Sequence, residues 1–349
     1  MKKITDLSLQ DKKVLVRCDF NVGLKDGEIV EDIRIQKALE TIEYAKSQGV
    51  RCIMVVSHLG RPEGEKKKEL SLYPVKQRLE ELLGSKVGLI DNPEDIQKNL
   101  EKAASGEIFL LENIRYWKEE KEGDRAFSSK IAGQFDVYIN DAFSASHRAH
   151  ASIAGFPEFT PEGAAGLLFE KELKNLSKVR FEPSTPAVAI IGGAKIETKL
   201  PVIKNLEENY DFILVGGMTA NEALDEEMEF SDKVLLPEDF SPKEKKEDRL
   251  DVGPATVEKF IDKINSAQTV VWNGPLGMFE DSDCAMGTKK VMEAIEKNKK
   301  AFKLVGGGET LEAVNRFSSL DNFDYVSMSG GAMLEFLAGK ELPGIEVLK

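Results

Sequence analysis

Four arginines lie in polar segments that follow apolar runs in the first half of the chain. Arg61 and Arg115 come directly after two such runs, Arg148 lies in SASHRAHAS (144–152), and Arg34 opens a helical pattern after the first run. The planar guanidinium fork suits phosphate and carboxylate groups. The three histidines of the chain fall in the same segments: His58, His147 and His150. These residues predict a binding site for a small, strongly anionic metabolite.

A second candidate site, in the second half of the chain, is built from glycine and lysine. In AVAIIGGAKIETKLPVIKNL (187–206), a glycine pair follows an apolar run and precedes Lys195 and Lys199. Proline is tolerated in the first turn of a helix, so Pro201 predicts a helix that begins near Thr198. Both lysines then sit at a helix N-terminus, where free amide N–H groups and the helix dipole favour phosphate.

The segment GGGETLEAV (306–314) repeats this arrangement, and Glu309 adds a carboxylate that can reach a phosphate-bound Mg²⁺. Neither segment matches the Walker pattern, and no G-x-G-x-x-G follows an apolar run, so P-loop and dinucleotide fingerprints are absent. No spacing of histidine, cysteine and glutamate indicates zinc, and no G-x-S-x-G indicates acyl transfer. We therefore expect a phosphate-bearing ligand held by a loop of another kind.

Short apolar, β-branched runs alternate with helical spacing along the chain, which is typical of parallel sheets covered on both faces. The sequence predicts an α/β fold with two doubly wound, Rossmann-like parallel-sheet domains joined by a helical hinge. Because parallel strands end at one edge of their sheet, we expect one ligand site per domain. The apolar runs are 14–20, 51–59, 107–113, 136–143, 187–193, 211–218, 233–237, 269–275, 302–308 and 325–331; the helical stretches are 34–49, 72–84, 167–179, 256–267 and 287–298.

Length and composition narrow the class of protein. At about 150 residues per domain, 349 residues predict two domains. The net charge of −13 repels nucleic acids and acidic membranes, and no apolar run approaches the ~20 residues of a membrane span. The N-terminal MKKITDLSLQDKK lacks the apolar stretch of a secretory signal, and three scattered cysteines favour reduced thiols. We expect a cytoplasmic monomer that binds neither nucleic acid nor membrane.

Eight segments, in this order along nearly the whole chain, resemble the motifs of phosphoglycerate kinases: RCDFNVGLKDGEIVEDIRI (17–35), SHLGRP (57–62), LLENIRY (110–116), NDAFSASHRAHAS (140–152), GGAKIETK (192–199), VWNGPLGMFE (271–280), GGGET (306–310) and LEFLAGKELPG (334–344). The resemblance implies reversible phosphoryl transfer between 1,3-bisphosphoglycerate and ADP, giving 3-phosphoglycerate and ATP. The transfer would be direct and in-line, with domain closure and with Mg²⁺ bound beside the nucleotide.

The resemblance also implies a division of the chain and a set of site residues. Residues 1–165 would bind phosphoglycerate, 166–186 would form the connecting helix and hinge, 187–328 would bind the nucleotide, and 329–349 would return to the first domain. The acid substrate would be held by Asp19, Asn21, Arg34, His58, Arg61, Arg115 and Arg148. The nucleotide would be held by Gly193, Lys195, Lys199, Gly217, Asn273, Pro275, Glu280, Gly306, Gly307, Gly308, Glu309 and Thr310. Arg34, Lys199 and Gly307 would be catalytic, and Glu309 would bind Mg²⁺ together with the nucleotide phosphates.

The sequence departs from the family pattern in the nucleotide half. Met218 stands in the third place of an expected glycine triplet, EAL (222–224) replaces a Thr-Phe pair, and the stretch 224–251 is shortened. Glu309 stands where aspartate is usual. Two alternatives therefore stay open: a non-catalytic relative that binds an anionic metabolite, and a related small-molecule kinase with altered nucleotide preference, GTP in place of ATP.

Overall fold

A computed structural model of the chain describes residues 1–241 and 249–349. By their internal contacts these residues form two compact units: unit 1 is Met1–Leu173 with Glu341–Lys349, and unit 2 is Lys174–Lys340. In the described part of the chain, no helix has the length and apolar character that crossing a membrane requires.

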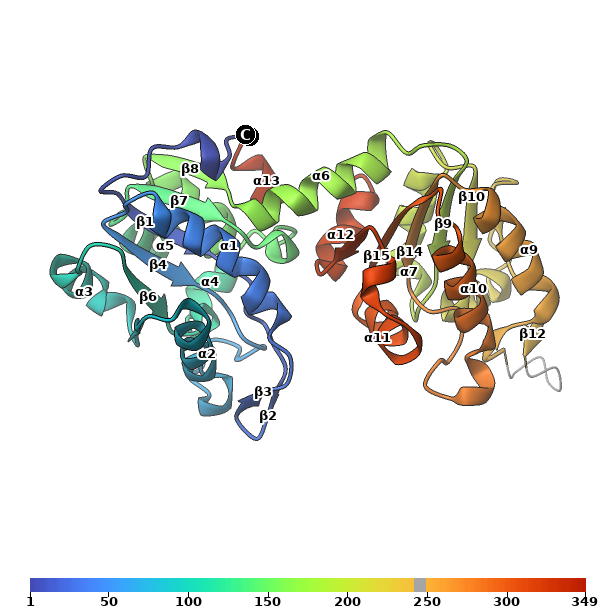
Figure 1. Cartoon of the computed structure of the whole chain (residues 1–349), viewed down its shortest axis with the longest axis horizontal. Coiled ribbons are helices and arrows are strands. Elements are labelled where there is room, and N and C mark those ends of the chain that lie inside the picture. Colours follow the sequence, from blue (N-terminus) through green and yellow to red (C-terminus); the bar gives the residue numbers. More distant parts are fainter. Residues whose placement is uncertain (242–248) are drawn as a thin grey trace. The chain divides into compact units, whose positions relative to one another are not determined.

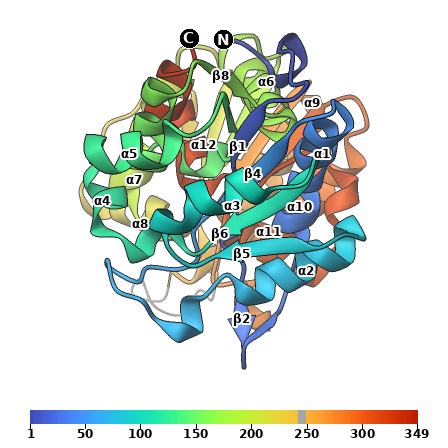
Figure 2. The same ribbon diagram turned by 90° about the vertical axis from the view of Figure 1, so that its left-hand side faces the viewer.

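Unit 1 is built on a parallel sheet in the order β5-β6-β4-β1-β7-β8. Helices α1 (Ile33–Ser47) and α2 (Tyr73–Leu83) cover one face, and α4 (Lys118–Glu122) and α5 (Arg125–Ala132) cover the other (Figures 1 and 2). The central strands are buried on both faces, which explains their continuously apolar sequences. The strands are β1 (Lys13–Arg17), β4 (Cys52–Val56), β5 (Val87–Ile90), β6 (Glu107–Leu111), β7 (Val137–Asn140) and β8 (Glu162–Ala165).

Smaller elements complete unit 1. A two-stranded hairpin leads into α1, α3 lies between β5 and β6, and α13 belongs to the C-terminal segment that packs in this unit. Their bounds are β2 (Leu24–Lys25), β3 (Glu28–Ile29), α3 (Ile96–Lys102) and α13 (Pro343–Glu346), with short helices at Ile4–Asp6, Lys68–Leu70, Pro93–Asp95, Ile114–Tyr116, Phe143–Ala145, Ala151–Gly155 and Phe156–Phe159.

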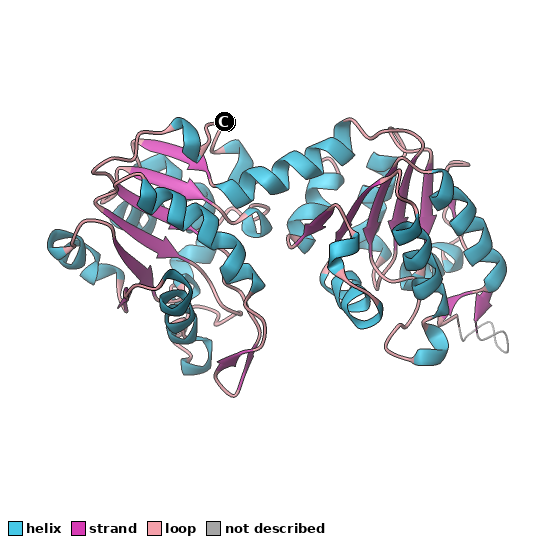
Figure 3. Cartoon of the chain, in the orientation of Figure 1, coloured by secondary structure: helices cyan, strands magenta, loops and turns pink. Residues whose placement is uncertain are grey.

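Unit 2 has a second parallel sheet, in the order β11-β10-β9-β14-β15-β16. Helix α7 packs against α8 and α12, whereas α9 and α10 pack together, so helices cover both faces (Figure 3). The order reverses between β9 and β14, which is where open sheets of this kind bind ligands. The strands are β9 (Ala187–Ile191), β10 (Phe212–Val215), β11 (Val234–Leu235), β14 (Thr269–Asn273), β15 (Phe302–Gly306) and β16 (Tyr325–Ser327).

The helices of unit 2 follow its strands one by one. Helix α6 (Leu167–Phe181) begins in unit 1 and continues into unit 2. The others are α7 (Ile196–Leu206), α8 (Gly217–Asp225), α9 (Pro254–Ser266), α10 (Met286–Lys297), α11 (Gly308–Phe317) and α12 (Gly330–Leu337), with short helices at Ser282–Cys284 and Leu320–Asn322 and a hairpin of β12 (Phe240–Ser241) and β13 (Asp251–Val252).

The α/β prediction is confirmed: each of the ten apolar runs contains a strand of one of the two large sheets, and each of the five helical stretches contains a helix. The predicted start of α7 near Thr198 is wrong. The helix begins at Ile196 and contains Pro201 in its interior, where the ring removes one backbone hydrogen bond. The Glu222 carboxylate accepts a hydrogen bond from the Ile196 N–H at 2.7 Å and supports the earlier start.

Asp141, which follows β7, has a structural task that makes stability depend on pH. Its Oδ1 accepts hydrogen bonds from Leu168 N at 3.0 Å and Phe169 N at 3.2 Å, at the start of α6. Burial raises the pKa of this carboxyl from 3.8 to about 7. Between these two pH values the folded protein holds a proton that the unfolded chain has released, so stability falls as the pH rises from about 4 to about 7.

We expect Asp141→Asn to remove this part of the pH dependence, because the amide oxygen still accepts both hydrogen bonds and carries no charge. The wild-type loss across the interval is at most about 4 kcal/mol, from ~1.4 kcal/mol per unit of pKa. Urea unfolding at pH 4.5 and pH 8 measures it, with the exposed Asp91→Asn as the control. Equal pH dependence in the Asp141→Asn variant and the wild type would contradict the assignment.

Candidate active site

The Asp19 carboxylate is the centre of the first candidate site, just beyond the end of β1 in unit 1. It forms an ion pair with the Arg34 guanidinium from the first turn of α1 and accepts a hydrogen bond from the Ser144 hydroxyl. His58 Nδ1, after β4, lies 3.9 Å from Asp19 Oδ1. Burial alone would raise the pKa of Asp19. The Arg34 charge, His58 and the hydrogen bonds from Ser144 and Asn21 N together outweigh burial, so this pKa lies well below its ordinary value.

The loops that follow neighbouring strands are joined by hydrogen bonds between asparagine side chains and the main chain. Asn21 Oδ1 accepts a hydrogen bond from Gly60 N at 2.8 Å, which joins the loops after β1 and β4. The buried Asn113 side chain donates to Leu59 O at 2.7 Å and accepts from Arg115 N at 3.2 Å, which joins the loops after β4 and β6. These bonds give the polar segments fixed positions along one sheet edge.

A cavity of about 170 Å³ lies among these loops. Arg61, Arg115, Lys121 and Arg148 line it, together with Pro62, Glu63 and His150. Arg115 Nη1 donates to Gly60 O at 2.8 Å, and burial, reinforced by other arginines nearby, lowers the pKa of its guanidinium to about 10. Four cations against one carboxylate make this cavity suitable for a phosphate group.

Unit 1 thus gathers the seven residues predicted to hold the acid. Asp19, Arg34 and His58 form one cluster, Asn21 links two of the loops, and the other three line the cavity, namely Arg61, Arg115 and Arg148. His147 is bonded to Arg148, whose Nε donates to His147 Nε2 at 2.9 Å.

Two charged residues beneath this site were not predicted from the sequence. Arg17 is completely buried, and its guanidinium donates to Ser152 Oγ at 2.8 Å and to His58 Nδ1 at 3.2 Å. Glu120, also buried, accepts from Ser152 N at 2.8 Å and from Ser152 Oγ at 2.6 Å. The signal for Arg17 was available, since an arginine inside the apolar run 14–20 must be buried with a partner. Nothing local distinguished Glu120 from the charged residues around it.

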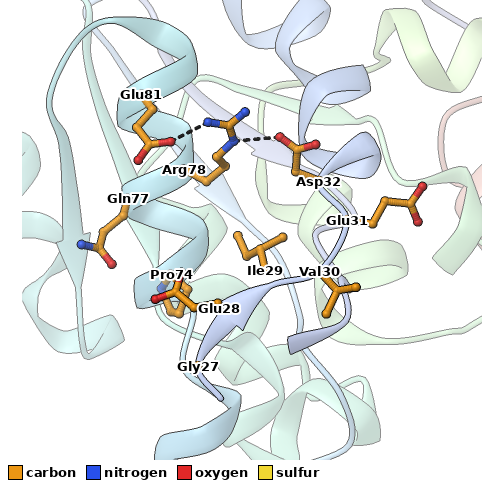
Figure 4. Close-up of a pocket in the computed structure, with 10 residues that line it drawn as sticks. All are labelled: Gly27, Glu28, Ile29, Val30, Glu31, Asp32, Pro74, Gln77, Arg78 and Glu81. Carbon is orange, nitrogen blue, oxygen red and sulfur yellow. Dashed lines mark hydrogen bonds and ion pairs between the residues drawn. The ribbon is translucent and has the colours of Figure 1, made fainter. Parts of the chain in front are cut away.

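Unit 1 also contains a cavity of about 570 Å³ that no predicted site residue lines. It lies between the segment 27–32, which includes β3, and α2. In Figure 4, Arg78 reaches between Asp32 and Glu81, with Nε 2.7 Å from Asp32 Oδ2 and Nη1 2.5 Å from Glu81 Oε2. Two further carboxylates, Glu28 and Glu31, line the cavity, so its charge is wrong for an anionic substrate.

In unit 2, two glycine turns meet beside the ends of β9, β10 and β14. Gly193 and Gly217 have φ angles of +93° and +62°, the left-handed region that glycine adopts without strain. Gly193 N donates to Pro275 O at 3.1 Å, and Gly193 O accepts from Thr219 N at 3.0 Å. A cavity of about 220 Å³ lies here, lined by Gly193, Ala194, Gly217, Met218, Arg249, Leu250, Pro275, Gly277, Met278, Glu280 and Glu309.

Lys199 projects from the first turns of α7 and is buried. Its ammonium donates to Asn273 Oδ1, and Asn273 Nδ2 donates to Gly306 O at 2.8 Å. Burial lowers the pKa of Lys199 to about 8, although Glu309 opposes the shift. The lysine is therefore tied to the end of β14 and, through Asn273, to the glycine loop after β15.

The loop after β15 leaves backbone amides accessible at the start of α11. Gly307 has φ +102°, and a Cβ there would lie 2.7 Å from Asn273 Nδ2, so only glycine fits. Nothing lies within 4 Å of a Cβ added to Gly308. The Thr310 hydroxyl faces inward and accepts from Gly274 N at 2.7 Å. Open space at a helix N-terminus is suitable for a phosphate.

The predicted nucleotide residues occupy three places in unit 2. Gly193, Gly217, Pro275, Glu280 and Glu309 line the cavity. Lys199 and Asn273 form the buried pair, and the glycine loop supplies Gly306, Gly307, Gly308 and Thr310. Lys195 precedes α7 as an exposed residue and is not among those that line the cavity.

The described residues contain no group of three or more histidine, cysteine, aspartate or glutamate side chains that could hold a metal ion by themselves. A Mg²⁺ bound to nucleotide phosphates needs only one or two carboxylates, because phosphates and water supply its other ligands. Glu309 is exposed at the start of α11 and lines the cavity, so this residue fits that role.

Two open parallel sheets, one with an arginine-lined cavity and the other with a buried lysine beside a glycine loop, have the architecture expected of a two-domain α/β phosphotransferase. A model of the phosphoglycerate kinase family matches residues 4–238 and 226–340. The phosphoglycerate kinases of Dictyoglomus turgidum and Thermosipho africanus are each 41% identical to the chain, over 389 and 393 residues. The alignments cover 99% of this chain and 98% and 97% of those proteins. The chain belongs to the phosphoglycerate kinase family.

Two solved structures agree with this assignment. Phosphoglycerate kinase from Coxiella burnetii superimposes with a TM-score of 0.88 and 35% identity, covering 99% of this chain and 98% of that one. The enzyme from Pyrococcus horikoshii superimposes with a TM-score of 0.84 and 28% identity, covering 100% of this chain and 98% of that one.

Proposed function

We propose that the chain transfers a phosphoryl group reversibly between 1,3-bisphosphoglycerate and ADP, giving 3-phosphoglycerate and ATP. Family membership supports this reaction. The observation that carries it is the small cavity of unit 1, where Arg61, Arg115 and Arg148 surround a space of about 170 Å³ close to the Asp19 and Arg34 pair. That arrangement suits a short acid with a phosphate at one end and a carboxylate at the other.

In the ATP-consuming direction the nucleophile is the carboxylate of 3-phosphoglycerate, which is already ionised at pH 7 and needs no general base. Catalysis then depends on positioning and on neutralising charge as the phosphoryl group passes in line between two oxygens. Arg34 would serve from the acid side, and Lys199 and the Gly307 amide from the nucleotide side. A bound Mg²⁺ would neutralise phosphate charge, with Glu309 holding it. Direct transfer requires the two ligands to meet, so we propose that closure of the units accompanies it.

The proposal extends to the setting of the enzyme. Cys18, Cys52 and Cys284 are buried and free, which supports a reducing compartment such as the cytoplasm. We propose that the chain acts there as a monomer.

A coupled assay with 3-phosphoglycerate and either MgATP or MgGTP tests the proposed reaction. We expect turnover with MgATP and loss of turnover when a chelator removes Mg²⁺. Turnover with MgGTP alone would support the alternative of an altered nucleotide preference. Absence of turnover with both nucleotides, together with binding of 3-phosphoglycerate, would leave the non-catalytic relative as the better description.

Glu222 offers a test of the nucleotide side, because its carboxylate lies at the end of α7 that carries Lys195 and Lys199. Glu222→Gln keeps an oxygen to accept from Ile196 N and removes a negative charge beside the phosphate site. Two unit charges ~8 Å apart in water interact with an energy of about 0.5 kcal/mol, which is the repulsion between carboxylate and phosphate that the substitution removes. We therefore expect the KM for ATP to fall about twofold, with kcat and the KM for 3-phosphoglycerate unchanged.

The exposed Glu226, which follows α8, supplies the matched control. Glu226→Gln removes the same charge from a position that does not line the 220 Å³ cavity, and it should leave the KM for ATP unaltered. A KM that rises in the Glu222→Gln variant would show that the charge assists nucleotide binding and would contradict the prediction.

A further inference from the structure

Three exposed apolar side chains gather around the 220 Å³ cavity of unit 2. Met218 is 53% exposed, Met278 is 45% exposed and Leu250 is 38% exposed. A cavity with apolar walls and few polar groups suits a planar ring system. Sulfur makes favourable contacts with aromatic rings, so two methionines at this place favour binding of a nucleotide base.

The backbone that carries these side chains is firmly connected. Gly217 N donates to Leu276 O at 2.9 Å, and Met278 N donates to Leu250 O at 2.8 Å. The loop 276–278 therefore joins the start of α8 to the segment that precedes β13. Because these bonds involve only the main chain, a chemical change at either thioether leaves the walls of the cavity in place.

Accessibility sets this pair apart from most methionines of the chain. Met54, Met292 and Met333 are buried within the cores of the two units. Met228, Met286 and Met328 are intermediate in burial. Met1, which is 40% exposed, is the other exposed methionine among the described residues. An oxidant in solution therefore reaches Met218 and Met278 before the methionines of the core.

We propose that Met218 and Met278 form a reversible oxidation site through which a hydroperoxide weakens nucleotide binding. Each thioether sulfur attacks the peroxide oxygen, the O–O bond breaks, and the products are one methionine sulfoxide and one water, or an alcohol from an organic peroxide. Sulfur is oxidised by two electrons and the peroxide is reduced by two. Methionine sulfoxide reductases of both epimer classes restore the thioether: a dithiol supplies two electrons and two protons, is oxidised to a disulfide, and the sulfoxide oxygen leaves as water. The proposal rests on the nucleotide role proposed above for this cavity.

The sulfoxide changes the chemistry of the wall. A flexible apolar group becomes polar and requires hydration, which a stacked base would remove. Loss of a sulfur–aromatic contact corresponds to roughly a two- to tenfold weakening for each methionine. We therefore expect oxidation to raise the KM for the nucleotide and to leave the KM for 3-phosphoglycerate, which binds in the other unit, near its original value.

The test begins with the untreated full chain, whose turnover and affinity for MgADP are measured first by assay and by calorimetry. Graded hydrogen peroxide is then applied, and peptide mass mapping locates each added oxygen. We expect Met218 and Met278 to be oxidised ahead of Met286, and MgADP affinity to fall in step with them. Methionine sulfoxide reductases should restore both. The Met218→Leu/Met278→Leu variant should keep its own untreated affinity after peroxide, whereas Met286→Leu should respond as the wild type does.

A second variant separates the site from unfolding. Met218→Gln/Met278→Gln imitates the polarity of the sulfoxides without an oxidant and should weaken MgADP binding roughly four- to a hundredfold, with unchanged circular dichroism. Faster oxidation of Met286, or unchanged MgADP affinity after both sulfurs are oxidised, would overturn the proposal. If the untreated chain binds MgADP but does not turn over, the proposed function fails, while mass mapping and calorimetry still decide the oxidation site.

Discussion

Arg34→Ala is expected to abolish measurable turnover while leaving unit 1 folded. Arg34 lies in the first turn of α1, and its guanidinium holds the Asp19 carboxylate. In the proposed reaction the same guanidinium neutralises charge on the phosphoryl group during transfer. Loss of one such group typically costs about 10²–10³ in rate. Loss of the substrate contact adds to this, so the combined effect is expected to be larger.

The fold should survive because Arg34 is partly exposed and Asp19 keeps other partners. The Ser144 hydroxyl and the Asn21 N–H still donate to the carboxylate. Circular dichroism and the urea midpoint check the fold, and a coupled assay measures kcat. Arg51→Ala is the matched control, because Arg51 is an exposed arginine just before β4, at the opposite end of that strand from His58. Near-normal kcat in the Arg34→Ala variant would overturn the role given to Arg34.

Lys199→Ala is expected to reduce kcat by about 10²–10³. The ammonium is buried, bonded to Asn273 and close to the glycine loop, so its charge is poorly screened by solvent. Burial lowers its pKa to about 8, and the approach of a nucleotide phosphate favours the charged form. Lys199→Arg should recover only part of the rate, because a planar guanidinium does not fit the space of a compact ammonium.

Lys204→Ala provides the comparison for this variant, since Lys204 is exposed in the last turn of the same helix. It removes an equal charge from unit 2 without touching the cavity or the glycine loop, and its kcat should stay near the wild-type value. If the Lys199→Ala variant keeps its kcat within about threefold of the wild-type value, the Lys199 charge is not needed for transfer and the role given to it is wrong.

Much of the fold could be predicted because the strands are buried on both faces and therefore have continuous apolar sequences. Strands β5 and β8 were not predicted, because VGLI (87–90) and EGAA (162–165) are short and contain glycine or alanine. Their extended conformation depends on pairing with the neighbouring strands of the sheet. The start of α7 predicted from Pro201 was wrong, because the hydrogen bond that supports an earlier start comes from Glu222, a residue distant in sequence.

The candidate sites were predictable to the extent that strand ends meet at one edge of each sheet. Asp19, His58 and Arg115 follow three different strands and come together for that reason. Asp141 also follows a strand, yet it binds the start of α6 and faces no cavity described above. Position at a strand end therefore predicts which residues lie near a candidate site, whereas long-range hydrogen bonds, which the sequence does not show, give residues such as Asp141 a structural role instead.

The membership of Glu341–Lys349 in unit 1 has a consequence for biosynthesis. Gly344 N donates to Ser146 O at 2.9 Å, in the loop that also carries Arg148. A ribosome makes all of unit 2 before it makes these nine residues, so nascent unit 1 must wait, without its last segment, while its neighbour is translated. The contact between Gly344 and the loop around Ser146 can therefore form only after the whole of unit 2 has been translated.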